Sequence, residues 1–313
     1  MTGNVSRVLD SIIIGEETTA GTEASSYNID LLGDIINCSL KTTENNQVLG
    51  GIQGGSTGGH LPSKIVNLSA TPVGSVTFHP HTLEFYKYVI SDFTSDSSSY
   101  TMNNNSALMP KSLSIKGNYD NTKGVKYLGC YLNNVRFSLA DNNIVSYTAD
   151  IVALYSTNTS ETVAYTAPAG SPLTYVGGVF TFDGNEWDLQ SFNNSYNCKF
   201  TQKFGLNTKA SGKKRYPSSI YRGGKAVISF DGVCNIEDIT DELQLAQGGT
   251  DVADYKNNSS LIMTMEDNDG ETHTITITGQ INEPEITQTD SEETNKTMTF
   301  SGVGVDFTVA GTK

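Results

Sequence analysis

Residues 260–281 read SLIMTMEDNDGETHTITITGQI, and this stretch decides the class of the fold. Apolar and polar side chains alternate along Ser260–Met265 and again along Thr272–Ile281, which is the period of a half-buried β-strand. Between the two runs, Asn268-Asp269-Gly270 supplies residues that tolerate the positive φ of a tight turn. The stretch therefore predicts an antiparallel β-hairpin.

The same two-residue period extends over the rest of the chain. Thr, Ser, Asn, Gly, Val, Ile and Tyr are plentiful, which is typical of strands and turns. We predict an all-β protein with further strands at Asp10–Gly15, Ile29–Thr42, Lys64–Phe78, Lys111–Lys116, Val125–Ala140, Ile144–Tyr155, Val179–Phe182, Glu186–Phe204, Lys225–Phe230 and Lys296–Val309. Two short helices are also predicted, Leu83–Phe93 capped by Thr82 and Ile236–Ala246 capped by Asn235.

Short pieces of sequence recur in the same order in the two halves of the chain. The echoes pair Asn37-Cys38 with Asn197-Cys198, Leu61-Pro62-Ser63 with Tyr216-Pro217-Ser218, Ser75–Phe78 with Val227–Phe230, Ser112-Leu113 with Ser260-Leu261, and Tyr147–Ala149 with Thr297–Thr299. Their offsets lie between 148 and 160 residues. We therefore predict two tandem modules, residues 1–157 and 178–313, joined by a Pro- and Gly-containing linker at 158–177.

Length and charge exclude several classes of protein. The 313 residues carry 34 acidic and 20 basic side chains, a formal net charge of −14, which disfavours gripping the phosphates of nucleic acid or docking on an anionic membrane. No window is apolar enough for a transmembrane helix. Met1–Asp10 lacks the pattern of a signal peptide, so we expect the four cysteines, none in a C-x-x-C pair, to be reduced and packed.

Positive charge is concentrated in one segment. Lys199–Lys225 holds eight bases and no acid, and its central part, Asn207–Gly224, is predicted to be a long exposed loop. Three interpretations stay open for it: contact with nucleic acid, a solvated surface, or contact with an acidic surface of a neighbouring copy. The last would favour head-to-tail stacking, since Asp231–Lys313 holds 17 acids against three bases.

Catalytic and metal-binding motifs do not emerge from the sequence. No phosphate loop, nucleophile elbow or zinc-protease motif occurs, and the carboxylate pairs identify no general acid or base. His79-Pro80-His81 offers only two ligands, and Asp267–Gly270 lacks the spaced carboxylates of a calcium loop, so both are interpreted as turns. We expect no enzyme activity, no cofactor and no metal.

Three stretches carry a family resemblance. Ser11–Thr22 reads SIIIGEETTAGT, an apolar strand followed by a Gly-x-Glu-x-Thr-like turn. Tyr127–Leu139, within Pro110–Tyr155, reads YLGCYLNNVRFSL, a Tyr-x-Gly-Cys pattern before alternating apolar residues. With the final apolar strand Thr297–Val309, these stretches resemble the major tail tube proteins of long-tailed (siphovirus-type) phages and related archaeal tailed viruses.

The resemblance implies a β-sandwich or partly closed barrel with a flanking helix, repeated in each module. It implies a structural virion protein, made in the host cytoplasm, whose rings stack into a tail tube that conducts double-stranded DNA during ejection. Six modules form a ring in this family, so a two-module chain would form a homotrimeric, pseudo-hexameric ring; a homohexamer is the alternative if the repeat is false. Implied partners are further copies of the chain and the tail-tip, tail-terminator and tape measure proteins.

Residue assignments for this assembly are limited. An acidic lumen would let DNA slide, because a basic one would hold it through many phosphate contacts, but the lumen-facing residues stay unassigned. We predict ring-to-ring contacts in the two long loops, at Lys209, Lys213, Lys214, Arg215, Arg222, Gly50, Gly54 and Gly58. The rival functions are a surface-exposed adhesin or carbohydrate-binding β-sandwich, and another structural virion component such as a decoration or baseplate protein.

Overall fold

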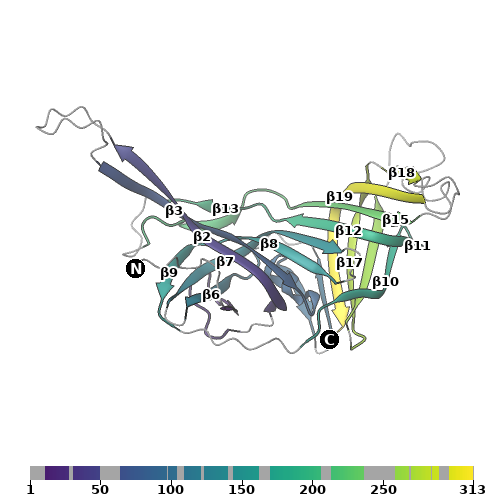
Figure 1. Ribbon diagram of the computed structural model, residues 1–313, viewed down its shortest axis with the longest axis horizontal. Coiled ribbons are helices and arrows are strands. Elements are labelled where there is room, and N and C mark those ends of the chain that lie inside the picture. Colours follow the sequence, from purple (N-terminus) through teal and green to yellow (C-terminus); the bar gives the residue numbers. More distant parts are fainter. Residues whose placement is uncertain are drawn as a thin grey trace, which may run out of the picture.

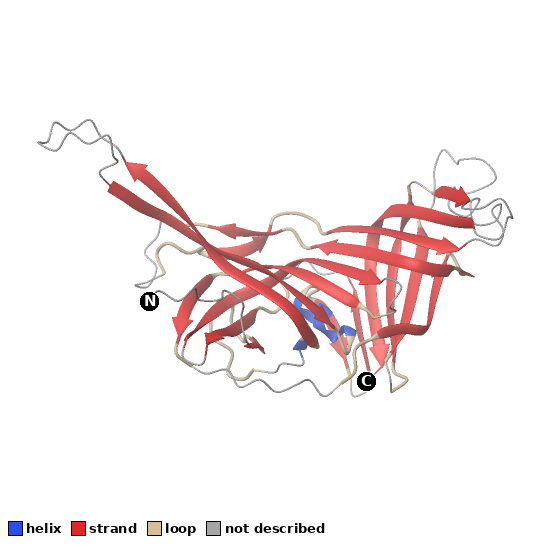
Figure 2. Cartoon of the chain, in the orientation of Figure 1, coloured by secondary structure: helices blue, strands red, loops and turns tan. Residues whose placement is uncertain are grey.

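The computed structural model describes residues 11–27, 31–49, 64–96, 98–103, 109–120, 123–139, 144–161, 170–205, 213–235, 258–267, 269–282, 284–288 and 296–312. The first-half strands are β1 Ser11–Glu16, β2 Asp34–Leu49, β3 Lys64–His79, β4 Asp92–Ser95, β5 Ser99–Asn103, β6 Leu113–Asp120, β7 Lys123–Leu139, β8 Ser146–Val152 and β9 Tyr155–Thr159. Those of the second half are β10 Thr174–Phe182, β11 Asn185–Glu186, β12 Asp188–Asn197, β13 Phe200–Lys203, β14 Ser219–Arg222, β15 Val227–Asn235, β16 Ser259–Glu266, β17 Thr272–Ile281, β18 Glu285–Gln288 and β19 Lys296–Thr312. The prediction of an all-β protein is confirmed (Figures 1 and 2).

The two halves share one order of antiparallel ladders. In the first half the order is β1–β6–β7–β8–β3–β2. In the second half it is β10–β16–β17–β19–β15–β12. An internal duplication predicts this correspondence, element by element in chain order.

A shared β-bulge sets the equivalence of the halves at the level of residues. Asp34 faces His79 at the start of the β2–β3 hairpin, and the register shifts two residues later. Asp188 faces Asn235 at the start of the β12–β15 hairpin, and the register shifts at the same place. Bulges are specific features of a strand pair. Asp34 is therefore equivalent to Asp188, at an offset of 154 residues, and His79 to Asn235, at an offset of 156.

This equivalence corrects the alignment that the sequence suggested. Phe78 was predicted to match Phe230, but its place in the hairpin is that of Cys234. Across the next ladder Phe78 faces Tyr147 on β8, and Cys234 faces Met298 on β19. Phe230 lies four residues before Cys234, on the same face of the strand. A shift of four residues keeps the alternation of apolar and polar side chains, so the sequence pattern does not reveal it.

The longest strands pass from one sheet into another. The first part of β7 pairs with β6 and β9, and its second part with β8 and β12. Gly129 lies at this corner with φ of 65°, where an added Cβ would lie 2.6 Å from a methyl carbon of Leu154. In the same way β19 pairs first with β15 and β18 and then with β17 and β5.

Aromatic side chains fill the core beneath the sheet that the two halves share. Phe78, Phe85, Tyr86 and Tyr147 form one cluster of fully buried rings with centroids 4.5–5.9 Å apart. Trp187, the one tryptophan of the chain, is buried in the second half. Each such ring removes a large apolar area from water, which is the main favourable term in folding.

The helix prediction was correct in its start and wrong in its length. Thr82 caps the 3₁₀-helix η2, Leu83–Tyr88, and its hydroxyl accepts a hydrogen bond from the Glu84 N–H. The helix does not reach Phe93, since residues from Asp92 onward form β4 and pair with β5. The second predicted helix, at 236–246, lies outside the described residues.

The predicted linker at 158–177 is structured at both ends. Strand β9 runs to Thr159, and β10 begins at Thr174. Leu173 is fully buried, and its N–H donates to the Pro80 carbonyl at 2.8 Å. The two ends of this stretch thus lie in strands, and the linker and the bounds of the two modules stay predictions.

Candidate self-assembly interface

One continuous sheet crosses the boundary between the halves. Its order is β2–β3–β8–β7–β12–β15–β19–β18, with every neighbouring pair antiparallel. The joint between the halves is the β7–β12 ladder, in which Asn134 faces Asn197 and Leu139 faces Phe192. Beside it, the Cys198 N–H donates to the Asn133 carbonyl at 2.7 Å.

A second ladder also joins the two halves. Strand β5 of the first half pairs with the end of β19, from Ser99 facing Thr312 to Asn103 facing Thr308. The buried hydroxyl of Tyr100 on β5 accepts a hydrogen bond from the Leu83 N–H at 2.9 Å and lies 2.7 Å from Nδ1 of His273. The two halves are thus held by two ladders and a buried polar chain.

The continuous sheet ends in two open edges. Within the described residues, β2 pairs only with β3, and β18 pairs only with β19. Leu40 on β2 and Ile286 on β18 are apolar side chains that are only partly buried against the core. Unpaired strand edges of this kind are templates for pairing with another chain.

The basic segment packs on the first half and is not one exposed loop. Arg215 lies 3.3 Å from Glu44, with its Nη2 toward the carboxylate, and its carbonyl accepts from the Ala70 N–H at 2.9 Å. The Lys213 ammonium lies 3.7 Å from the ring centroid of Tyr155. The loop prediction for 207–224 was therefore wrong at its end, because β14 pairs with β13 and 213–217 contacts β2, β3 and β9.

The other predicted contact residues have different positions. Lys214 is exposed, and the Arg222 guanidinium lies 5.6 Å from the Phe200 ring centroid. Lys209 and the three loop glycines, Gly50, Gly54 and Gly58, lie outside the described residues. The hairpin that leads toward those glycines projects far from the body of the molecule (Figure 1, purple and blue strands β2 and β3). A ring-to-ring role for these residues stays a prediction.

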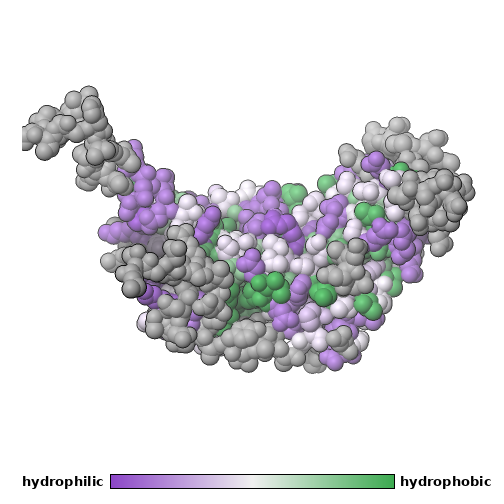
Figure 3. All heavy atoms as spheres, in the orientation of Figure 1, coloured by the Kyte–Doolittle hydropathy of each residue, from purple (hydrophilic) through white to green (hydrophobic). Residues whose placement is uncertain are grey.

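The exposed face of the continuous sheet, here called the polar face, is lined by hydroxyl and amide groups. A shallow hollow of about 440 Å³ lies between Arg136, Ser146, Asn193 and Ser229. Hydrophilic and near-neutral residues cover most of the upper margin of Figure 3, along which β3, β8, β12 and β15 run in Figure 1. By strand alternation this face carries the bases Lys41 and Arg136 and the acids Asp34, Asp150, Asp188, Asp231 and Glu285.

The histidines of the 79–81 turn make hydrogen bonds within the fold, and the cysteines are packed inside it. His79 Nδ1 lies 2.8 Å from the Val145 carbonyl, and His81 Nε2 lies 3.2 Å from Asp34. The four cysteines are thiols that form no disulfide, and burial raises the pKa of Cys38 and of Cys198 to about 12. Such thiols are protonated and unreactive at neutral pH.

No strand was predicted from the sequence at β4, β5, β14 or β18. The three edge or joint strands β5, β14 and β18 are four or five residues long, so their alternation is too short to stand out. The only signal for β18 is the run Glu285-Ile286-Thr287, which follows Pro284.

Comparison with known proteins adds no assignment. No protein-family model matches the chain, and no curated protein is similar enough to count as a match. Among the described residues, no helix has the length and apolar character needed to cross a membrane.

Proposed function

We propose that the chain is the structural subunit of a tubular assembly, in which rings of the chain close through their sheet edges and stack to form a conduit. The conduit would be a viral tail tube that passes double-stranded DNA, as the resemblance of the sequence implies. The observation that carries the proposal is the β7–β12 ladder, because it joins two equivalent halves edge to edge and leaves equivalent edges open at both ends.

The open edges correspond to the strands of the internal joint. Strand β2 occupies in the first half the place that β12 occupies in the second. Strand β18 continues β17 along β19. In the same way the second part of β7, which pairs with β8, continues the first part, which pairs with β9. Repeating the internal joint between chains therefore pairs β18 of one chain with β2 of the next, and three chains would supply the six halves of one ring.

The internal joint also gives the register of the joint between chains. Asn193 lies five residues after Asp188 and faces Ser138 on β7. Its equivalent on β2 is Ser39, five residues after Asp34, since both hairpins contain the same bulge. Ser39 is exposed and is therefore available for pairing.

The partner of Ser39 follows from the strands next to β7 and β18. Ser138 faces Ser146 on β8, whereas Thr287 on β18 faces Thr297 on β19. Ser146 directly precedes Tyr147, which faces Phe78, and Thr297 directly precedes Met298, which faces Cys234. Phe78 and Cys234 have the same place in their hairpins, so Ser146 and Thr297 are equivalent. In the proposed joint, Ser39 of one chain would therefore lie opposite Thr287 of the next.

The polar face supports a conduit rather than a DNA-binding surface. It would line the lumen when the sheet closes, since the opposite face is buried against the aromatic core. Its charges give two bases against five acids, a balance of −3. A weakly acidic, hydroxyl-rich wall offers few counterion-releasing contacts to phosphates, so DNA would slide along it.

A cysteine pair tests the proposed joint. Ser39→Cys with Thr287→Cys should give covalently linked trimers on mild oxidation of assembled rings, because directly opposite residues in antiparallel strands bring Cβ atoms to about 4.5–5.5 Å. Non-reducing electrophoresis and electron microscopy measure the outcome.

A register-shifted pair is the matched control. Thr43→Cys with Thr287→Cys places one thiol four residues further along the same exposed face of β2, too far for a disulfide. Equal cross-linking of both pairs, or rings in which neither pair links, would contradict the register. Monodisperse single chains at all concentrations would contradict the proposed function itself.

A further inference from the structure

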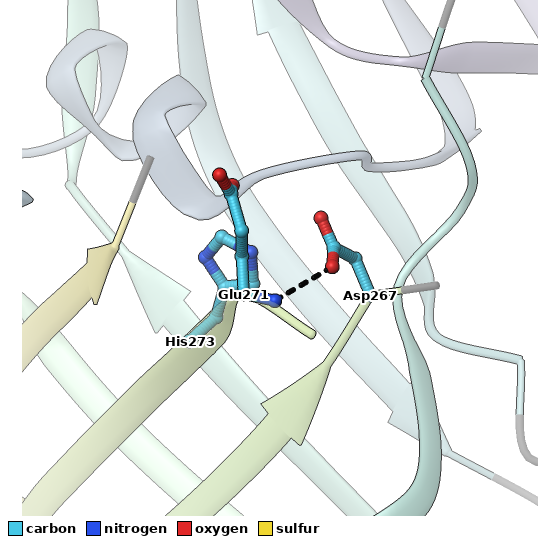
Figure 4. Close-up of side chains that lie close together, drawn as sticks. All are labelled: Asp267, Glu271 and His273. Carbon is cyan, nitrogen blue, oxygen red and sulfur yellow. Dashed lines mark hydrogen bonds between the residues drawn. The ribbon is translucent and has the colours of Figure 1, made fainter. Parts of the chain in front are cut away.

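Three potential metal ligands converge where β16 and β17 are joined. Asp267 follows the last residue of β16, Glu271 precedes β17, and His273 is the second residue of β17. One ligand atom from each of the three lies within 4.8 Å of the others. Figure 4 shows the three side chains close together, with Glu271 drawn over the imidazole ring of His273 and Asp267 to one side of both.

His273 supplies an unpartnered nitrogen at this place. The side chain is fully buried, and its Nδ1 is occupied by the Tyr100 hydroxyl at 2.7 Å. Its Nε2 is buried without a hydrogen-bond partner among the described residues. A buried polar atom left unpaired is costly and calls for an explanation such as a bound ion. Burial lowers the pKa of His273 and outweighs the opposite effect of the Asp267 carboxylate, so the neutral ring is favoured.

The two carboxylates are placed to act with that nitrogen. Oδ1 of Asp267 accepts hydrogen bonds from the backbone N–H groups of Asp269 and Glu271, at 2.9 and 2.8 Å. These bonds fix the carboxylate beside the imidazole and leave Oδ2 available. Within the described residues, no ion pair or hydrogen bond occupies the carboxylate of Glu271.

We propose that Asp267, Glu271 and His273 form a binding site for a divalent transition-metal cation of the Zn²⁺ type. Imidazole nitrogen with two carboxylate oxygens is a ligand set that Zn²⁺ accepts, with a solvent molecule in the fourth position. The cation balances two carboxylate charges and pairs Nε2. Ca²⁺ and Mg²⁺ are disfavoured, because they prefer sites made of oxygen ligands alone.

The second ring nitrogen links the site to the joint between the halves. A ligating histidine is commonly held through its other nitrogen by a hydrogen-bonding group, which fixes the ring. Here that group is Tyr100 on β5, the first-half strand that pairs with β19. A bound cation would therefore stabilise the β5–β19 joint as well as the hairpin, by preferential binding to the folded chain.

Titration of the chelator-treated full chain with ZnCl₂ tests the site. The thermal midpoint should rise by a few degrees with ZnCl₂ and not with MgCl₂ or CaCl₂. Substituting CoCl₂ should give the visible absorption of Co²⁺ with nitrogen and oxygen ligands. Glu271→Gln should weaken Zn²⁺ binding in calorimetry at least about tenfold, because ligand loss costs no less than loss of a supporting contact.

Asp269→Asn is the matched control. It removes the same charge from the same turn, but its exposed side chain is not one of the three converging groups, so Zn²⁺ affinity should not change. Equal Zn²⁺ affinity for Glu271→Gln and the unaltered chain would overturn the proposal, as would the absence of any midpoint shift or Co²⁺ spectrum. Glu271 is only partly buried, so its amide variant should fold, and circular dichroism without metal checks this. The site does not depend on ring formation, so the two proposals fail independently.

Discussion

At the scale of single residues, Glu17 explains one part of the sequence that resembles tail tube proteins. Its carboxylate is buried and accepts four hydrogen bonds, from the Ser112 and Ser114 hydroxyls and from the Gly21 and Gly129 N–H groups, at 2.7–2.9 Å. The bonds connect the turn after β1 to β6 and to the corner of β7. No neutral side chain of this shape can accept all four.

Glu17→Gln should therefore destabilise the fold. The amide group has donors where one carboxylate oxygen accepts. A serine hydroxyl can rotate to accept from the amide, but one buried backbone N–H is left without a partner, at a cost of about 2 kcal/mol in the free energy of unfolding. Denaturant titration measures it. Glu16→Gln is the matched control, because Glu16 makes part-exposed contacts to Lys87 and Lys111 and should cost about 1 kcal/mol or less. Equal losses in both variants would contradict the role given to Glu17.

At the scale of elements, equivalent hairpins serve different purposes. Strands β12 and β15 have ten and nine residues, and the chain between them forms the β13–β14 hairpin that packs on the first half. The Gln202 amide of β13 donates to the carbonyls of Pro72 and Ala153, at 3.1 and 2.7 Å. Strands β2 and β3 have sixteen residues each and project from the body (Figure 1). The projecting end of β2–β3 is therefore the better candidate for contacting a neighbouring ring.

Shortening this hairpin should separate stacking from folding. Residues 46–68 can be replaced by an Asn-Gly turn, because Asn45 and Ser69 face each other in the ladder. The thermal midpoint should change little, since Asn46, Gln47, Asn67 and Leu68 are exposed. Electron microscopy should show rings that no longer elongate. Tubes of normal length from this variant would exclude the hairpin from ring-to-ring contact.

At the scale of the whole molecule, the distribution of charge matters more than its sum. The formal charge is −14, yet around the hollow of the polar face Ser, Thr and Asn side chains outnumber the charged ones, which are Arg136 and Asp231. Arg136 on that face is held by Asp150 through two hydrogen bonds, at 2.9 and 3.1 Å. The charge of Arg136 is thus balanced by Asp150 within the sheet. A surface along which DNA is proposed to slide would need such balancing.

If the polar face lines a conduit, as proposed, making it basic should convert it into a DNA-binding surface. Asn193→Lys, Ser195→Lys and Ser229→Lys add three cations beside the hollow. The variant should retain duplex DNA at low salt with an affinity that falls steeply as salt rises, whereas the unaltered tube should not. Co-sedimentation measures retention.

Lysines at the exposed positions Ser95, Thr101 and Asn185 change the net charge equally and are the control. If the control retains as much DNA as the variant, or if the unaltered assembly already binds DNA tightly, the polar face does not line the conduit.

The sequence alone determined the class of the fold and the extent of some strands, whereas β2, predicted at Ile29–Thr42, spans Asp34–Leu49. Thr272–Ile281 was predicted residue for residue, and the cap at Thr82 was correct, because alternation and capping act between neighbours along the chain. The basic character of 199–225 was also readable. The contact of Arg215 with Glu44 could not be predicted from the sequence, since the two residues are 171 positions apart and no local pattern links them.

Only the tertiary structure decided which edges are paired and which stay open. Strand β5 was missed, yet it joins the halves, and β18 was missed, yet it forms one open end of the sheet. Register was also undetermined by sequence, since a strand shifted by two or four residues keeps its apolar face. The ligand cluster at Asp267, Glu271 and His273 exists because a hairpin turn and Tyr100 on a distant strand meet around one buried imidazole. Such convergence depends on long-range packing, which a local pattern does not encode.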